Sequence, residues 1–172
     1  HPEYYSEDPI LTGTLMAYQA RGLEENGVIA TYKHLIANNM EFERKSAHGI
    51  IDENTLRDLY LRVFDKAFSL YKPGCVMTSY NPVNGIYPCE NSALLNDLLR
   101  GEWGFDGFVM TDWGSYDTAD SIRSVCAGTN LLTPGSKKHF RMILKAVKRN
   151  EISKAALQHS VKQIVKVLVR CI

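Results

Sequence analysis

The chain has 172 residues, of which 45% are hydrophobic and 23% charged, and its 20 Lys and Arg residues nearly balance its 19 Asp and Glu residues. This length and composition are typical of one globular domain or part of one and argue against a disordered chain. The formal net charge of +1 gives no general electrostatic reason to bind nucleic acid or an anionic membrane. No apolar run approaches the roughly 20 residues of a membrane-spanning helix.

The cysteines show no sign of a disulfide framework or a metal site. They stand at positions 75, 89, 126 and 171, without CxxC spacing, and the histidines have no ligand-type neighbours at metal spacing. We therefore expect free, mostly buried thiols and no metal. The absence of an Asn-x-Ser/Thr sequon also favours a reducing compartment such as the cytoplasm. Residues 1–5 do not resemble a signal peptide, although a leader on a longer parent protein stays open because the chain does not begin with Met.

Strand-like and helix-like segments alternate along the chain. Helical periodicity is predicted over residues 11–23, 56–67 (with Asp52 as N-cap), 94–99, 143–147 and 161–168. Four short apolar segments without strict alternation, mostly preceded by turn residues, predict strands buried on both faces, at residues 28–33, 75–79, 108–111 and 130–133.

This order predicts an α/β fold with about four parallel strands. No GxGxxG or GxxxxGK[ST] motif follows a strand, which counts against a nucleotide-binding open sheet and gives no reason to expect a cofactor. A complete (β/α)8 barrel needs about 250 residues. We therefore expect a partial TIM-like barrel.

Polar side chains collect where the predicted strands end, and in parallel α/β folds these ends form the site. The sharpest candidate is Asp112, directly after the third strand. A desolvated, ionised carboxylate there could act as a nucleophile at a sugar carbon, and Lys33 could keep it ionised. Local position alone favours the alternative of a helix N-cap or loop aspartate.

The other candidates also have structural alternatives. Lys33 and His34 close the first strand, but neighbouring strand residues point to opposite faces, so both reach a ligand only if the strand ends or bulges there. They could instead form a buried ion pair and a core histidine. Met77 near Tyr80 could fill the core, and Trp113 could stack on a sugar ring or pack against a helix.

Five blocks of the chain resemble glycoside hydrolase family 3, in the family's order: residues 5–9, 27–39, 76–85, 99–114 and 127–135. The second block is similar to the family's Lys-His-Phe-x-x-Asn pattern, the third to its Met-x-Ser-Tyr-Asn-x-x-Asn-Gly pattern, and the fourth to its nucleophile signature. Departures are modest: Leu35 stands where Phe is usual, Met40 where Gln is common, and Thr111 where Ser is commoner.

The resemblance implies a retaining, exo-acting β-glycosidase of the β-glucosidase type, which acts on terminal β-linked sugars by double displacement. Asp112 falls on the family's nucleophile and Trp113 on an aromatic that borders the leaving-group side. The positions that hold or line the glycone subsite are Lys33, His34, Met77 and Tyr80.

The resemblance also implies missing parts. Residues 1–172 match the later portion of the family's N-terminal (β/α)8 domain, without its earlier strands and without the following α/β sandwich domain that supplies the acid/base carboxylate. The expected partners are therefore a β-linked glycoside and the remainder of the same polypeptide. We expect the isolated fragment to be inactive and to expose strand edges and an apolar inner face.

Two rival functions remain open. One is a non-catalytic or vestigial carbohydrate-binding fragment, because the acid is absent. The other is a Schiff-base aldolase-type barrel that uses Lys33 as the amine.

Overall fold

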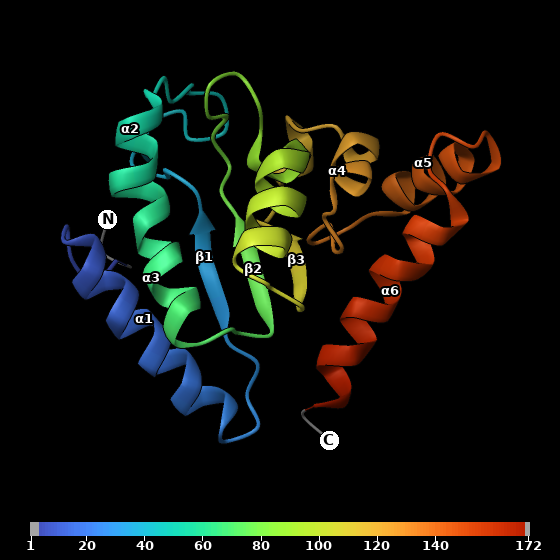
Figure 1. Ribbon diagram of the computed structural model, residues 1–172. Coiled ribbons are helices and arrows are strands. Elements are labelled where there is room, and N and C mark those ends of the chain that lie inside the picture. Colours follow the sequence, from blue (N-terminus) through green and yellow to red (C-terminus); the bar gives the residue numbers. More distant parts are fainter. Residues whose placement is uncertain (1–3, 171–172) are drawn as a thin grey trace.

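The computed structural model describes residues 4–170 and contains a three-stranded parallel sheet flanked by helices (Figure 1). The strands lie in the order β1-β2-β3 and comprise β1 (Thr31–Leu35), β2 (Cys75–Thr78) and β3 (Phe108–Thr111). In Figure 1, α1 and α3 lie beside β1, whereas α4, α5 and α6 lie beyond β3. Within residues 4–170, no helix has both the length and the hydropathy to cross a membrane.

The helices alternate with the strands, as in a βα-repeat fold. Their bounds are α1 (Pro9–Glu24), α2 (Glu53–Thr55), π-helical η1 (Leu56–Leu61), α3 (Arg62–Leu70), 3₁₀ η2 (Pro88–Glu90), π-helical η3 (Ala93–Glu102), 3₁₀ η4 (Ser115–Asp117), α4 (Ser121–Ala127), α5 (Lys137–Lys148) and α6 (Lys154–Val169).

Five of these helices (α1, α2, α4, α5 and α6) begin with a short polar side chain that accepts hydrogen bonds from otherwise unpaired backbone N–H groups. Asp52 does so for α2, as the sequence predicts, with its carboxylate 3.0 Å from the Thr55 nitrogen. Four further N-caps are Asp8, Asp120, Ser136 and Ser153.

The two faces of the sheet are covered differently. One face carries Tyr32, Val76 and Val109, which belong to the main core with α1, α3 and η3. The packing of α1 on α3 is close, because a Cβ atom on Gly13 would lie 2.5 Å from the Val63 carbonyl oxygen. The other face carries a smaller buried cluster, formed by Cys75, Phe108 and the α6 residue Val167. Its partly buried neighbours are Ile29, Met110 and Ile164.

The α/β class with a parallel sheet is confirmed, but two strands differ from the predicted segments. β1 begins at Thr31 rather than at residue 28, because its partner strand starts only at Cys75, which pairs with Thr31. The fourth predicted strand, 130–133, forms a single parallel bridge, between Leu131 and Met110. Its neighbour Asn130 accepts the Val109 N–H with its side chain at 2.7 Å, and this bond takes the place of one backbone hydrogen bond of a regular ladder.

The thiols described by the structure are free. Cys75 and Cys89 are buried, whereas Cys126 is exposed. The fourth cysteine, Cys171, lies outside the described residues.

Candidate active site

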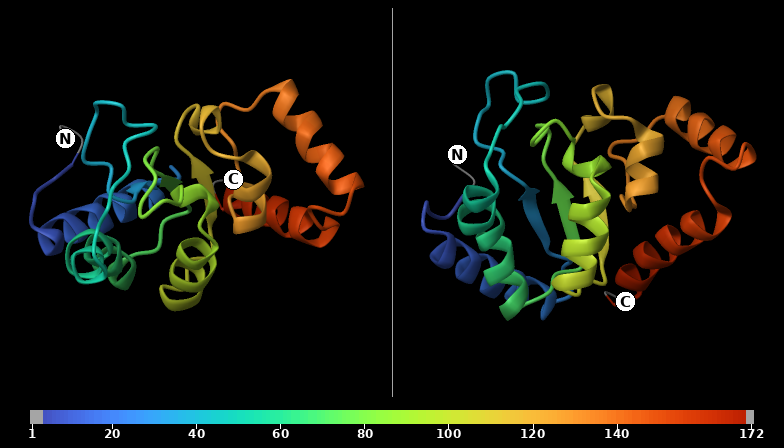
Figure 2. Two further views of the ribbon diagram at one scale, coloured as in Figure 1. Left: turned by 90° about the horizontal axis from the view of Figure 1, so that it is seen from above. Right: turned by 45° about the horizontal axis from the view of Figure 1, so that its top comes forward.

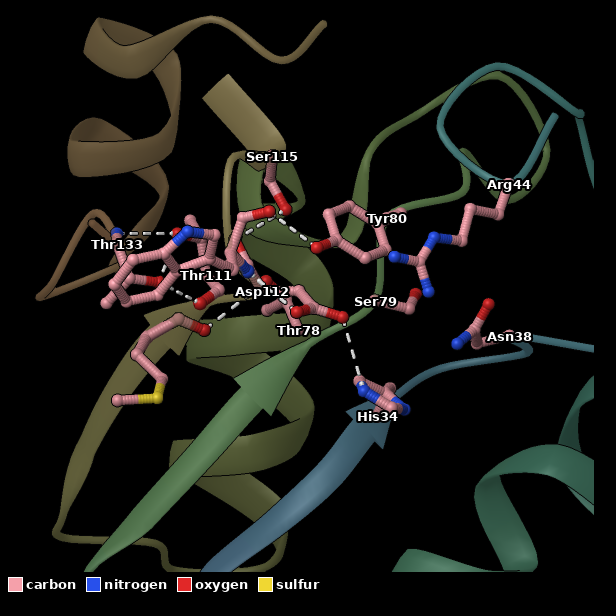
Figure 3. Close-up of polar contacts among 12 residues, drawn as sticks. His34, Asn38, Arg44, Thr78, Ser79, Tyr80, Thr111, Asp112, Ser115 and Thr133 are labelled. Atoms are coloured by element: carbon pink, nitrogen blue, oxygen red, sulfur yellow. Dashed lines mark hydrogen bonds and ion pairs between the residues drawn. The ribbon is translucent and has the colours of Figure 1, made fainter. Parts of the chain in front are cut away.

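The chain segments that follow β1, β2 and β3 lie at the same end of the sheet (Figure 2). This convergence brings together His34 from the end of β1, Tyr80 from just after β2 and Asp112 from directly after β3 (Figure 3). The three side chains are far apart in sequence, and the parallel strand register brings the strand ends that carry them together.

Asp112 is the centre of this group. Its Oδ2 atom lies 3.2 Å from Nε2 of His34, and its Oδ1 atom accepts the Trp113 backbone N–H at 2.6 Å. The Asp112 side chain is 14% exposed and that of His34 only 6% exposed, so the pair is shielded from water while the carboxylate keeps one open side. Asp112 is therefore not a helix N-cap, because its carboxylate contacts His34 and the Trp113 N–H, and the following helix η4 begins after Gly114.

The surroundings of Asp112 keep its carboxyl group ionised. Burial, the largest single influence, raises its pKa, but the hydrogen bond and charge of His34, the Trp113 N–H and the Tyr80 hydroxyl together outweigh burial. The net pKa lies below 3.8, the usual value of an aspartate. At neutral pH the site therefore presents a partly desolvated carboxylate.

His34 is held on both sides of its ring. Opposite Asp112, its Nδ1 lies 3.2 Å from the hydroxyl of Tyr4, which also donates to the Asn38 carbonyl at 3.3 Å. The two ring nitrogens thus face different partners, Nε2 the Asp112 carboxylate and Nδ1 the Tyr4 hydroxyl. This arrangement fixes the orientation of the imidazole beside Asp112.

Tyr80 supports the backbone next to Asp112. It is 4% exposed, and its hydroxyl donates to the Trp113 carbonyl at 2.5 Å. Burial and then the charge and hydrogen bond of Asp112 raise the pKa of Tyr80 to about 12, so the phenol stays protonated. The one hydroxyl proton of Tyr80 is donated to the Trp113 carbonyl, and the proximity of this hydroxyl to Asp112 helps to lower the pKa of that carboxyl group.

The turn that carries Asp112 is also tied to the fourth predicted strand. Thr111, 1% exposed, accepts the Thr133 N–H with its hydroxyl at 2.9 Å, and the Thr133 hydroxyl donates to the Thr111 carbonyl at 2.5 Å. The Thr133 carbonyl in turn accepts the Gly114 N–H at 2.8 Å. Thr133, in the segment that pairs with β3 at a single bridge, thus contacts the chain both before Asp112, at Thr111, and after it, at Gly114.

The other predicted site residues occupy different places. Lys33 is exposed. The side chain that contacts the Asp112 carboxylate is that of His34, whereas the sequence suggests Lys33 for this contact. The β1–β2 register is irregular between Tyr32 and Leu35, which is the break in the strand that allows neighbouring side chains to escape strict alternation.

Met77 and Trp113 are placed differently from the buried group around Asp112. Met77 is half-buried and pairs with Met110 on the sparsely covered face of the sheet. The Trp113 side chain is 66% exposed, whereas its backbone N–H and carbonyl contact Asp112 and Tyr80. Trp113 is therefore not packed beneath the following helix.

The sequence does not predict the part that Arg44 takes in this group. The guanidinium carbon of Arg44 lies 4.6 Å from the centre of the Tyr80 ring, and Figure 3 shows the side chain reaching toward the site. Arg44 belongs to the loop after β1, several residues past the strand end, and pairs with Glu41 at 2.9 Å. Only a motif that extends beyond the strand end could have identified it.

The site contains no group of metal ligands among the described residues, and it is separate from a large hollow that they also form. Among residues 4–170, no three His, Cys, Asp or Glu side chains come together to hold a metal ion. A hollow of about 560 Å³ lies at the opposite end of the sheet, lined by residues that include Tyr71, Gly74 and Val167. Gly74 directly precedes β2, so this hollow is remote from the carboxyl ends of the strands.

The chain matches the model of the glycosyl hydrolase family 3 N-terminal domain over residues 2–167. It is 39% identical over 169 residues to probable beta-glucosidase J of Aspergillus fumigatus, covering 96% of this chain and 19% of that protein. It is 40% identical over 167 residues to thermostable beta-glucosidase B of Acetivibrio thermocellus, covering 96% and 22%. The chain thus spans about a fifth of the length of these curated relatives.

Solved structures show the same similarity. Beta-glucosidase 3B of Thermotoga neapolitana, in complex with glucose, superposes with a TM-score of 0.92 at 40% identity, covering 98% of this chain and 24% of that one. A family 3 β-glucosidase of Bifidobacterium adolescentis gives 0.92 at 34% identity, with 98% and 25% covered.

Proposed function

The chain belongs to glycosyl hydrolase family 3, as part of that family's N-terminal domain, and from this premise we propose that its full-length protein is a retaining, exo-acting β-glycosidase. The substrate is a terminal, non-reducing β-linked sugar, with glucose favoured because the relatives are named β-glucosidases. Asp112 is the proposed nucleophile.

One observation supports this proposal above all others: the Asp112 carboxylate lies ionised and partly desolvated at the end of β3, with one oxygen on His34 and the other on the Trp113 N–H. These contacts restrict rotation of the carboxylate while a side of it stays open. A retaining glycosidase needs such a group beside the anomeric carbon.

The proposed reaction has two displacements. Asp112 attacks the anomeric carbon while a separate carboxylic acid protonates the departing oxygen, and water then hydrolyses the glycosyl-enzyme. Within residues 4–170, Asp112 has no second carboxylate among its hydrogen-bond or ion-pair partners. The acid is therefore assigned to the remainder of the polypeptide.

The neighbouring side chains receive binding roles. Lys33 and His34 would hold hydroxyl groups of the glycone, Met77 and Tyr80 would line its subsite, and Trp113 would border the leaving group. The 66% exposure of the Trp113 side chain suits an aromatic surface for a sugar ring. The exposure of Lys33 does not favour the rival aldolase reading, because a Schiff-base lysine is activated by desolvation or a cationic neighbour.

The chain itself is proposed to be the later part of the N-terminal barrel. β1 is an edge strand in the described sheet, and the face that carries Met77 and Met110 is incompletely covered. Earlier barrel strands and a following α/β sandwich domain would cover these surfaces and complete the site. We accordingly assign activity to the full-length protein and not to residues 1–172 alone.

We expect a mechanism-based 2-fluoroglucoside to label Asp112 in the full-length protein, because the fluorine slows hydrolysis of the glycosyl-enzyme and lets it accumulate. Peptide mass spectrometry after digestion would locate the adduct, and hydrolysis of nitrophenyl β-glucoside would report turnover. Labelling of another carboxylate would refute the role of Asp112. Sugar binding without turnover or labelling would favour the vestigial carbohydrate-binding alternative.

The pH dependence should reflect the lowered pKa of Asp112. Attack requires the ionised carboxylate, so kcat/KM should persist as the pH falls until it passes through the lowered pKa, below 3.8. In Tyr80→Phe, one group that lowers the Asp112 pKa is lost, so the acidic limb of the profile of kcat/KM against pH should move to higher pH. Tyr18→Phe changes a tyrosine that is 62% exposed and should leave the limb in place. Brief assays followed by return to neutral pH separate titration from unfolding, and an unshifted limb in Tyr80→Phe would contradict the assignment.

A further inference from the structure

The loop after β1 is joined to the turn after β3 by one lysine. The Lys45 ammonium lies 2.7 Å from Asp117 Oδ2 and donates to the Gly114 carbonyl at 3.2 Å. The Lys45 carbonyl itself accepts from the Tyr87 hydroxyl at 3.3 Å. The lysine is therefore anchored at its backbone while its side chain reaches across to a different loop.

The Lys45 ammonium lies directly against the backbone of Gly114, where a side chain would crowd it. Gly114 has a φ of +79°, and a Cβ atom there would lie 3.3 Å from the Lys45 ammonium nitrogen. The Gly114 N–H is already committed to the Thr133 carbonyl at 2.8 Å. The turn at Gly114 is therefore held at two points, by Lys45 on the Gly114 carbonyl and by the Thr133 carbonyl on the Gly114 N–H.

Lys45 is also part of the surroundings of Tyr80. Its ammonium lies 5.5 Å from the centre of the Tyr80 ring, and the Tyr80 hydroxyl donates to the Trp113 carbonyl. Two consecutive peptide groups of the turn are therefore held by side chains from other loops, the Trp113 carbonyl by Tyr80 and the Gly114 carbonyl by Lys45. The N–H of the same Trp113 donates to the Asp112 carboxylate.

We propose that Lys45 is a positioning residue, which holds the 112–117 turn so that the Trp113 N–H stays aimed at the Asp112 carboxylate. This inference rests on the proposed function for its effect on turnover. It acts through backbone geometry, because Lys45 contacts the turn and not the carboxylate. A misplacement of a reacting group by about 1 Å can cost on the order of a hundredfold in rate.

Lys45 differs from the ordinary surface ion pairs of this chain. Its side chain is 35% exposed and links two separate loops, whereas Arg57 pairs with Glu53 one helical turn away, with exposures of 61% and 75%. Exposed pairs of the second kind contribute little to stability. Arg57→Met is therefore a matched control that removes a cation and an ion pair without touching the site.

The test uses Lys45→Met, Lys45→Arg and Arg57→Met in the full-length protein. We expect Lys45→Met to lower kcat on nitrophenyl β-glucoside on the order of tenfold with a smaller change in KM, since the effect is on alignment for attack. Lys45→Arg keeps a cation and several donors and should recover most of the loss. Arg57→Met should match the wild type.

Amide hydrogen exchange of residues 112–117 tests the same inference without turnover. Lys45→Met should exchange several-fold faster in this segment, whereas Arg57→Met should not. Unchanged exchange in Lys45→Met, or a kcat within twofold of wild type, would overturn the role of Lys45. Failure of the wild type to hydrolyse or be labelled would instead refute the proposed function, and the exchange measurement would still decide whether Lys45 holds the turn.

Discussion

Asp112→Ala should abolish almost all hydrolysis of nitrophenyl β-glucoside by the full-length protein, with kcat reduced about 10⁴-fold or more, roughly 5.5 kcal/mol in activation free energy. The reason is that the first displacement loses the group that forms the glycosyl-enzyme, and no other carboxylate among residues 4–170 is described in contact with that position. Steady-state kinetics with the purified variant measure the loss directly.

Two controls make the Asp112 result specific. Azide should restore turnover in Asp112→Ala and form an α-glycosyl azide, because a small anion can enter from the face that the carboxylate occupied. Asp58→Ala removes an exposed aspartate of η1 and should keep wild-type activity. Residual activity in Asp112→Ala within tenfold of wild type would mean that another group is the nucleophile.

His34→Ala should lower kcat/KM on the order of a hundredfold, about 3 kcal/mol, because truncating His34 leaves the buried Asp112 carboxylate without one of its hydrogen bonds. The His34 side chain is 6% exposed and lies 3.2 Å from the Asp112 carboxylate, so water cannot readily replace it. The loss should be accompanied by a higher pKa of Asp112, since His34 is the strongest influence lowering it.

His159 provides the matched control for His34. It lies exposed on α6, with Nε2 3.3 Å from the Gln163 side chain. His159→Ala should therefore leave both kcat/KM and the acidic limb unchanged. Equal losses of kcat/KM in the two histidine variants would indicate a general effect on folding. If His34→Ala leaves kcat/KM unchanged, His34 has no role in the site.

Hydrogen bonds between the loops at the strand ends explain how a small sheet can position a reactive group. Asp112 follows a strand whose residues Val109 and Thr111 are 0% and 1% exposed, so its backbone starts from a rigid base. Beyond the strand, the turn is fixed by Tyr80 and Lys45 from neighbouring loops. The rigid sheet thus sets the location of the carboxylate, and the loops set its orientation.

Several features could be read from the sequence because their causes are local. The β-α alternation, the strand at 108–111 and the N-cap at Asp52 follow from apolar periodicity, turn residues and short-range hydrogen bonds. The fourth strand was overestimated because an apolar run at 130–133 cannot reveal that the Asn130 side chain takes the place of a ladder hydrogen bond.

The sequence by itself determined the fold class, the family and the position of a carboxylate at the end of a buried strand, because these depend on residue type and spacing along the chain. Only the tertiary structure decided that His34, rather than Lys33, contacts Asp112, and that Arg44 and Lys45 approach Tyr80. These contacts join residues on separate loops. Their geometry follows from the register of parallel strands and from the irregular end of β1, which residue spacing does not encode.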